Sequence, residues 1–324
     1  MSQAPPAVIL LATRNGERFL PAQLESILAQ SHENWRLLAR DDDSTDRTPE
    51  VLKDFAARDR RIQILPGGQQ QGATGNFSLL LSAAPGTGLC FFCDQDDLWP
   101  HDRLERMLAA FESRTSQTAP ETPTLLHTDL RLIDSTGAEI APSMRPWVAA
   151  SHADDDPLGL LLAQNFVTGC SATLNEPLRH LAAPIPTEAI NHDWWLALIA
   201  AATGHIHYLA EALTDHRRHA ANSNPIARSP RWRDRLPSKA PANPARRRLV
   251  RRLKQSVALE SRLAERAPEC PALPRLRAWN RAWKKGPLAA VRASIRHGIR
   301  LQDPARTALF RSHLLACLPL TDAD

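Results

Sequence analysis

The sequence predicts an α/β fold in which a mostly parallel sheet is flanked by helices and followed by a helical C-terminal region. Short apolar segments of strand length alternate with segments of helical period, which is typical of βαβ units. Polar side chains follow the ends of several apolar segments, where sheets of this kind bind their ligands. After about residue 228 the pattern becomes helical and basic, which suggests a C-terminal appendage.

The first two elements are a strand and a helix. Residues 7–13 (AVILLAT) form a short apolar run typical of a buried strand. Residues 17–30 have a helical period, with Phe19, Leu24 and Ile27 on one apolar stripe. The two elements therefore begin the first βαβ unit.

The next elements continue the alternation. WRLLA at 35–39 is the second predicted strand, and a helix at 49–57 follows it. A third strand at 62–65 leads through a glycine-rich turn and the segment 76–84 to an apolar strand at 89–93. This order predicts several strands that share one direction.

Composition is that of a soluble globular enzyme. The 324 residues are 43% hydrophobic and 23% charged, and no apolar run approaches the roughly 18–20 residues that span a bilayer. The N-terminus lacks the basic region of a signal peptide, so we expect a cytoplasmic protein.

Five cysteines, an odd number, argue against a disulfide framework. Cys90 and Cys93 lie in one predicted core strand, and their side chains point to opposite faces of it. We therefore expect both to be core residues.

The net charge of +5 is unevenly distributed. Residues 228–254 hold eleven Lys or Arg against one Asp. One interpretation is a solvated helix face; the other is attraction to anionic lipid headgroups, which contributes about 1 kcal/mol per basic residue near the surface. A nucleic-acid partner is not expected, because no basic platform interleaved with aromatic residues is present.

Polar residues follow three of the predicted strands. Because the carboxyl ends of parallel strands meet at one edge of a sheet, we expect these residues to line the same edge. The sequence has neither GxGxxG nor GxxxxGK[ST], which disfavours a dinucleotide dehydrogenase or a P-loop NTPase. The three groups are Thr13, Arg14 and Asn15; Asp41, Asp42 and Asp43; and Asp94, Asp96 and Asp97.

The third group, in FFCDQDDLWP, places three carboxylates within four positions. Packed carboxylates repel one another unless a cation offsets them. Oxygen ligands suit Mg²⁺ or Mn²⁺, and substrate phosphates usually complete the shell of such an ion. For Asp97 the alternative is a cap of the helix that begins near residue 101.

In combination the motifs resemble a family 2 glycosyltransferase with the Rossmann-like GT-A fold. The resemblance covers residues 7–225 and rests on TRNGERF, RDDDSTD, GNFSLLL, FFCDQDDLWP, NFVTGCSATLN and INHDWW. Within that family, DQDDLW and HDWW look most like the rhamnosyltransferase branch. We therefore expect a glycosyltransferase domain at 1–225 and a basic helical region at 226–324.

The resemblance implies roles in donor binding. Thr13, Arg14 and Asn15 match the loop that holds the nucleotide. Asp41 and Asp42 match the pair in which a carboxylate binds the base. This chain has Asp43 where the family usually has glycine, and Asp tolerates left-handed backbone angles better than most residues.

Two further carboxylates match the family's DxD motif. The resemblance assigns Asp94 to the ribose and Asp96 to the metal and the diphosphate, with Mg²⁺ or Mn²⁺ as cofactor. Arg218 and His219 match a basic segment that pairs with the diphosphate. The alternative for this segment is a basic surface loop.

The catalytic base implied by the resemblance is Asp193. It would accept the proton of the acceptor hydroxyl during an inverting transfer. His192 stands where the family often has glutamate. The alternative for Asp193 is a cap of the apolar helix that follows it, and the two roles are compatible.

Four residues are candidates for contact with the acceptor, and for each a core or loop role is the alternative. These residues are His127, Asp129, Trp194 and Trp195.

The function implied is transfer of a sugar, with L-rhamnose from dTDP-rhamnose as the first choice, to a glycan or lipid-linked acceptor in cell-surface polysaccharide synthesis. The alternatives are a UDP-hexose or UDP-N-acetylhexosamine transferase and a non-catalytic relative that binds sugar nucleotides. The basic C-terminal region is expected either to dock on the inner face of the cytoplasmic membrane or to form a packing or homodimer surface.

Overall fold

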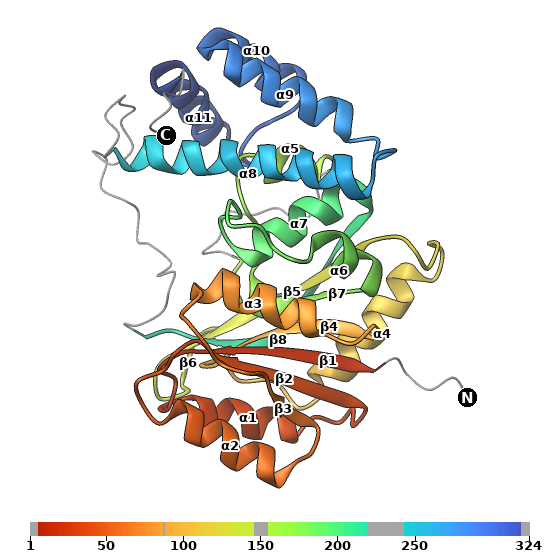
Figure 1. Cartoon of the computed structure of the whole chain (residues 1–324), viewed down its shortest axis with the longest axis vertical. Helices are drawn as coiled ribbons and strands as arrows, with labels where there is room; N and C mark the ends of the chain where they lie inside the picture. The colour runs from red at the N-terminus through yellow and green to blue at the C-terminus, as the bar shows by residue number, and fades with distance from the viewer. Residues whose placement is uncertain (1–5, 87, 146–154, 220–242, 319–324) are drawn as a thin grey trace.

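The computed structural model describes residues 6–86, 88–145, 155–219 and 243–318. One 8-stranded sheet runs through the molecule in the order β3-β2-β1-β4-β7-β5-β6, with β8 paired to β5. Helices cover both faces of this sheet, and a helical layer is stacked beyond one of them (Figure 1). The predicted α/β class is confirmed.

The first half of the sheet is parallel and follows the predicted order. It consists of β1 (Ala7–Thr13), β2 (Trp35–Asp41), β3 (Ile62–Ile64) and β4 (Leu89–Asp94). β1 is central, and its seven residues are buried or nearly so. Connections run through α1 (Leu20–Leu28), α2 (Thr48–Arg58) and α3 (Gly72–Ala83).

The second half of the sheet is mixed, so the parallel arrangement holds for only part of it. β7 (Ala172–Leu174) is antiparallel to both of its neighbours, β4 and β5 (Thr124–Ile133). β6 (Glu139–Ala141) pairs antiparallel with β5, whereas β8 (His205–Arg217) pairs parallel with it. A 3-10 turn, Gly169–Ser171, leads directly into β7.

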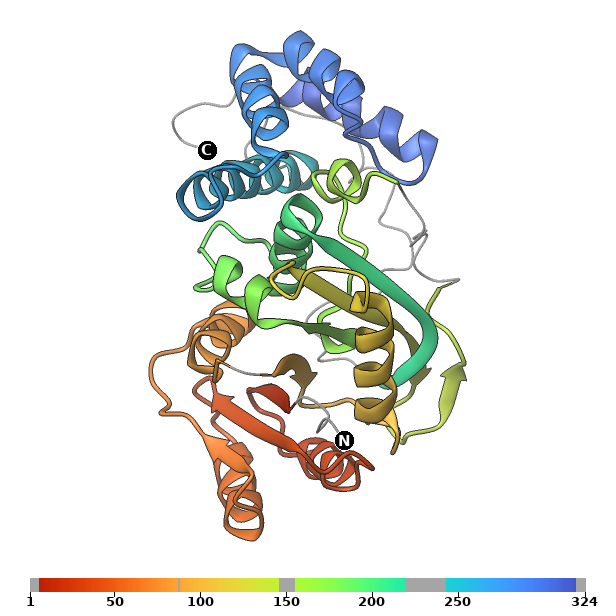
Figure 2. The same ribbon diagram turned by 90° about the vertical axis from the view of Figure 1, so that its right-hand side faces the viewer.

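Two apolar clusters form on opposite faces of the sheet. Ile9, Leu11 and Phe91 pack with α1, α2 and α4 (Arg103–Thr115) on one face. Alternate strand residues such as Leu10 and Phe92 pack with α3, α6 (Glu176–Ala182) and α7 (His192–Thr203) on the other face. Figure 2 shows the two helical layers from the side. Strand alternation thus divides the side chains between two cores.

The C-terminal helices extend the second cluster. α8 (Pro244–Arg266) lies across α7, and α9 (Leu273–Lys285), α10 (Pro287–Arg296) and α11 (Pro304–Cys317) lie beyond it (Figure 1). Leu249, Leu253 and Leu259 of α8 belong to the same cluster as Trp195 of α7. A short helix, α5 (Pro157–Leu161), contributes three leucines to this cluster and packs against α7. The predicted boundary at 225/226 falls outside the described residues.

The described residues contain neither a helix that could span a membrane nor a disulfide bond. Among them no helix has both the length and the hydropathy needed to cross a bilayer. All five cysteines are buried and unbridged, including Cys90 and Cys93 in β4, as their predicted core role requires.

Candidate active site

The ends of β1, β2 and β4 meet at one edge of the sheet, as predicted. Thr13 is in register with Asp41, and Ala12 is in register with both Arg40 and Asp94. The three loops that leave these strands are therefore neighbours. They carry the residues for which donor binding was predicted.

The loop after β2 is built around Asp41. Its Oδ1 accepts hydrogen bonds from Thr13 Oγ1 at 3.0 Å and Ser44 Oγ at 2.6 Å, and its Oδ2 accepts one from Ser44 N at 2.8 Å. Asp43 has a φ of 65°, a left-handed angle at the position where glycine is usual in the family it resembles. The turn therefore forms without glycine, as predicted.

The loop after β1 is fixed to both of its neighbours. Arg14 N donates to Gln95 Oε1 at 2.7 Å, and Gln95 Nε2 donates back to Arg14 O at 2.8 Å. Asn15 Oδ1 accepts from Thr45 N at 2.8 Å. The Arg14 side chain is exposed, whereas the amide of Asn15 is used to hold the loop. Gln95, which had no predicted role, is the clamp between the β1 and β4 loops.

Asp42 requires a correction. Its side chain is buried and turned away from the edge, where Oδ1 accepts from Arg40 Nη1 at 3.1 Å and from Gln71 N at 2.7 Å. Oδ2 accepts from Gly72 N at 2.8 Å. Asp42 therefore orders the start of α3 and neutralises a buried arginine, so we withdraw its predicted contact with the nucleotide.

A hollow of about 330 Å³ lies beside Asp41. Its lining combines two carboxylates, one hydroxyl and one lysine with apolar side chains and two glycines. Such a mixture suits a flat heterocycle that needs one polar edge recognised. The lining residues are Asp41, Asp43, Ser44, Pro49, Leu52, Lys53, Ile64, Leu65, Gly67 and Gly68.

The carboxylates after β4 form the electrostatic centre of the edge. Burial, together with the charges of Asp97 and Asp96, raises the pKa of Asp94 to about 8. Burial and Asp97 also raise the pKa of Asp96, although His219 Nε2 lies 2.6 Å from Asp96 Oδ2 and opposes the shift. The ionised forms of Asp94 and Asp96 are therefore both disfavoured unless a positive charge offsets them.

Asp97 differs from its two neighbours because it has a cation of its own. Its Oδ1 contacts His216 Nδ1 at 3.0 Å and accepts from Arg217 N at 3.0 Å. Burial disfavours its charge, but His216 outweighs burial and lowers the pKa of Asp97. The same contact, against the effect of burial, raises the pKa of His216 to about 9. The predicted helix cap is not seen: α4 begins at Arg103, with Asp102 at the capping position.

A divalent cation fits this set of residues. Asp94 and Asp96 supply carboxylate oxygens whose ionisation the protein itself disfavours, and Asp97 Oδ2 is buried without a hydrogen-bond partner among the described residues. Hard oxygen donors of this kind suit Mg²⁺ or Mn²⁺. One ligand atom from each of Asp97, Cys170 and His216 also lies within 4.8 Å of the others, a softer set beside the first.

Asp193 lies in the first turn of α7, and its charge is one of those that raise the pKa of Asp94. Its Oδ1 accepts from Asn165 Nδ2 at 3.1 Å and from Trp194 N at 2.6 Å, and its Oδ2 accepts from Gly169 N at 3.1 Å. Burial outweighs these bonds and raises the pKa of Asp193 to about 6. Both predicted properties are therefore compatible: the carboxylate stabilises the helix start and has the basicity of a general base.

His192 and the two tryptophans after it are core residues. The His192 ring lies 4.1 Å from that of Phe77, and burial lowers its pKa to about 3. Trp194 Nε1 donates to Leu161 O at 2.7 Å, and Trp195 Nε1 donates to Ala182 O at 3.0 Å. With 8% and 0% exposure, respectively, the tryptophans are not placed to stack on an acceptor sugar, which corrects that prediction.

The other acceptor candidates lie along β5 and are buried. The His127 ring is 5.1 Å from that of Tyr208. Asp129 accepts from Ser143 Oγ at 2.5 Å and from Met144 N at 3.2 Å, so it orders the chain after β6. Acceptor binding by His127 and Asp129 stays a prediction.

The end of β8 brings basic side chains to the edge. His219 contacts Asp96, as described above, and Arg218 is half-buried beside it. Arg217 belongs to the same basic segment, and its Nε donates to Asp96 O at 2.8 Å. Together with His216, which contacts Asp97, both Arg217 and His219 thus contact the β4 loop.

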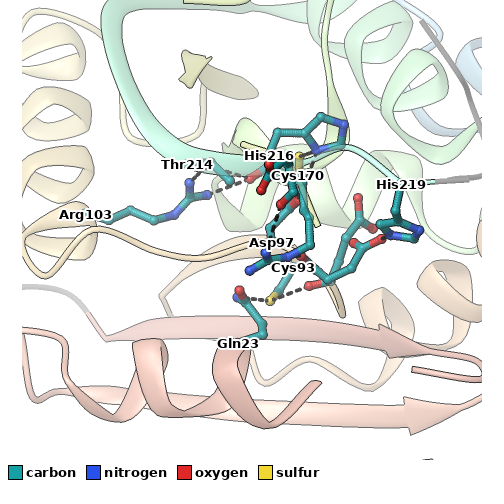
Figure 3. A network of polar contacts seen from close by, with 12 residues as sticks. Gln23, Cys93, Asp97, Arg103, Cys170, Thr214, His216 and His219 are labelled. Atoms are coloured by element: carbon teal, nitrogen blue, oxygen red, sulfur yellow. Dashed lines mark hydrogen bonds and ion pairs between the residues drawn. The ribbon is translucent and has the colours of Figure 1, made fainter. Parts of the chain in front are cut away.

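A buried arginine holds this end of β8 in place (Figure 3). Arg103 Nη1 donates to Leu213 O at 2.7 Å and to the Thr214 hydroxyl, and Nη2 donates to Cys170 O at 2.8 Å. Arg103 therefore ties α4 to β8 and to the 3-10 turn that carries Gly169. Sequence patterns gave no signal for this link, because its partners are mainly backbone carbonyls.

Comparison with known proteins was informative for the N-terminal part. Residues 8–124 match the model of Glycosyl transferase family 2. The Escherichia coli UDP-Glc:alpha-D-GlcNAc-diphosphoundecaprenol beta-1,3-glucosyltransferase WfgD is 35% identical over 101 residues, which are 31% of this chain and 39% of that protein. The aligned part thus spans well under two thirds of this relative.

Solved structures resemble nearly the whole chain. TarS 1-349 of S. aureus in complex with UDP-GlcNAc has a TM-score of 0.51 at 14% identity, covering 95% of this chain and 90% of that one. Mannosyltransferase PcManGT of Pyrobaculum calidifontis, in complex with GDP-Man and Mn²⁺, has a TM-score of 0.51 at 15% identity, covering 97% and 86%. These likenesses show a GT-A fold, and the family match supports family 2.

Proposed function

We propose that this chain, with its GT-A fold and its match to glycosyltransferase family 2, transfers a sugar from a nucleoside diphosphate donor to a hydroxyl of a glycan or lipid-linked acceptor. One observation carries the proposal. The edge formed by the ends of β1, β2 and β4 combines a hollow lined by Asp41 with the clustered carboxylates of Asp94 and Asp96, and the carboxylate of Asp193 on α7 has a pKa of about 6. These are the parts that a sugar transfer requires.

We assign the donor to the first two parts. The base would enter the hollow beside Asp41, with Thr13 and Arg14 close to the nucleotide. Asp94 is assigned to the ribose and Asp96 to the cation. A bound Mg²⁺ or Mn²⁺ neutralises charge on the diphosphate leaving group. Arg218 and His219 add positive charge at the same point, where it favours departure of the diphosphate.

Asp193 is assigned as the general base. Its carboxylate takes the proton from the acceptor hydroxyl as that oxygen forms a bond to the anomeric carbon of the sugar, while the bond from that carbon to the diphosphate oxygen breaks. The nucleoside diphosphate leaves with the electron pair. Attack from the side opposite the leaving group inverts the anomeric configuration.

Two donor classes are supported by different observations. DQDDLW and HDWW resemble the rhamnosyltransferase branch, which favours dTDP-L-rhamnose. The names of WfgD and of the TarS complex carry UDP-Glc and UDP-GlcNAc, which favours a UDP-hexose or UDP-N-acetylhexosamine. The name of WfgD, with its undecaprenol-linked acceptor, supports a role in cell-surface polysaccharide synthesis.

The test is a donor panel with the purified full chain, with release of nucleoside diphosphate as the readout. We expect one donor class to be turned over in Mg²⁺ or Mn²⁺ and turnover to be lost in Asp96→Ala. Glu188→Gln, an exposed residue before α7, is the control and should behave as wild type. Direct binding of each donor is measured in parallel, because a missing acceptor suppresses turnover. If no donor binds, the proposal is wrong.

A further inference from the structure

α10 exposes apolar side chains on the face that points away from the protein. Ala290, Ala293 and Ser294 are buried and mark the inner face of this helix. Leu288 and Ile295 lie on the opposite face, seven residues apart, and are 66% and 59% exposed. They are the two most exposed large apolar side chains of the described residues. A helix that only packs on a core would carry polar residues at these positions.

The surroundings of this apolar face are uniformly basic. Residues 271–302 contain eight Lys or Arg and no Asp or Glu. Lys284 and Lys285 end α9 just before Leu288, and Arg292 and Arg296 lie on the exposed side of α10 beside Ile295. All four are exposed, and no ion pair links them to a carboxylate of the described chain.

An open hollow of about 560 Å³ adjoins the C-terminal end of α10. Arg296 belongs to its lining, so the hollow continues the basic face. One carboxylate is present, Asp156, and it is already bound by Arg275 through both oxygens, at 2.7 and 2.6 Å. The other lining residues are Pro271, Pro274, His297 and Gly298.

We propose that the outer face of α10, formed by Leu288, Arg292, Ile295 and Arg296, docks the protein on an anionic lipid bilayer. Apolar side chains with flanking cations are the composition of helices that lie in a membrane interface. Long basic side chains keep their charge at the headgroups while their stems follow the apolar surface. The two apolar residues would enter the acyl boundary, and the cations would meet the lipid phosphates.

A second copy of the chain is the rival occupant. A two-fold interface on this face would bring Arg292 and Arg296 against the same cations of the partner, and no acidic residue of the face offsets them. Like charges brought together in this way cost several kcal/mol. An anionic surface has no such penalty, and its charge complements the face.

This proposed membrane contact differs in position from the one predicted from sequence, which was the basic segment 228–254. Residues 228–242 of the predicted segment lie outside the described residues. In α8 the apolar side chains Leu249, Leu253 and Leu259 are buried in the core. α8 therefore presents cations without exposed apolar partners, whereas α10 presents both.

The experiment is co-sedimentation of the full chain with vesicles of phosphatidylcholine, with or without phosphatidylglycerol. We expect binding only with phosphatidylglycerol and weakening by salt. Arg292→Gln with Arg296→Gln should weaken binding about thirtyfold, which corresponds to about 1 kcal/mol for each cation. The matched control, Arg36→Gln with Arg60→Gln, removes the same charge from exposed sites of the sheet domain and should have a much smaller effect.

A second pair tests the apolar contribution. Leu288→Ser with Ile295→Ser should weaken vesicle binding about tenfold or more, since exposed apolar area no longer enters the acyl boundary. Leu79→Ser with Ile140→Ser, at 44% and 47% exposure, is the control and should leave binding unchanged. Light scattering of each variant reports its oligomeric state. No binding to anionic vesicles at low salt, equal binding by all variants, or a dimer that only the α10 variants dissociate would overturn the proposal.

Discussion

Asn165 donates a hydrogen bond from Nδ2 to Oδ1 of Asp193 over 3.1 Å, while its own Oδ1 accepts from Val167 N. The loop before the 3-10 turn is thus fixed to the first turn of α7. Gly169 N holds the other carboxylate oxygen. Oδ1 of Asp193 already accepts two hydrogen bonds, from Asn165 Nδ2 and Trp194 N, whereas Oδ2 accepts one. The second acceptor site of Oδ2 is therefore the one for the proton, and these bonds set its direction.

The pH dependence of transfer should report Asp193. Its carboxyl has a pKa of about 6 and must be ionised to accept a proton. Activity should therefore rise about tenfold per pH unit below pH 6 and level off above about pH 7. Initial rates across pH at saturating donor measure this limb. Asp193→Asn should lose about 10²- to 10⁴-fold in kcat, and a limb that persists near pH 6 in its residual activity would identify another base.

Asn165→Ala tests the restraint on the base. Loss of a hydrogen bond to the ionised carboxylate should raise the pKa of Asp193 and move the acidic limb to higher pH. We expect kcat to fall about tenfold with donor affinity unchanged, because a misdirected base affects transfer and not binding. Pre-steady-state rates and donor titration separate the two. A fall in donor affinity with an unmoved limb would contradict the role.

Which features of the fold and of the candidate site could be predicted from the sequence depended on the kind of contact that forms them. The edge formed by Thr13, Asp41 and Asp94 followed from strand order, because parallel strands bring their carboxyl ends together whatever their side chains are. The left-handed angle of Asp43 was likewise a local property of the chain. Local pattern and topology were enough for these features.

Other contacts depend on side chains that meet only after folding. Asp42 looked equivalent to Asp41 in sequence, yet the two point to opposite sides of the chain as it leaves β2, and only Asp42 meets Arg40 and the start of α3. The bonds from Arg103 to backbone carbonyls leave no residue-type signal at the partner positions. Such roles follow from packing, which a single sequence does not display.

Asp42→Ala and Asp41→Ala should therefore separate stability from binding. Asp42→Ala leaves the buried guanidinium of Arg40 without its carboxylate and removes the acceptor of Gln71 N and Gly72 N. We expect it to lower the free energy of unfolding by about 3–5 kcal/mol. Asp41→Ala removes bonds from Thr13 and Ser44 at the edge and should mainly weaken donor binding. Denaturant unfolding and donor titration measure both; equal stability losses would contradict the assignment.

Removal of divalent cations should weaken donor binding and not only turnover. Without a cation, the ionised carboxylate of Asp96, together with that portion of Asp94 which is ionised, repels the diphosphate. We expect donor affinity to fall at least about tenfold when a chelator is added, and to recover with Mn²⁺ or Mg²⁺. Calorimetric titration at pH 8 measures this change.

Two variants test the role of the ion. Asp96→Ala should bind donor weakly with or without the ion. Asp193→Asn is the control that keeps metal-dependent binding, because its side chain is assigned to the acceptor proton. Wild-type affinity that is indifferent to the chelator would remove the cation from the site and leave Arg218 and His219 as the charges that bind the diphosphate.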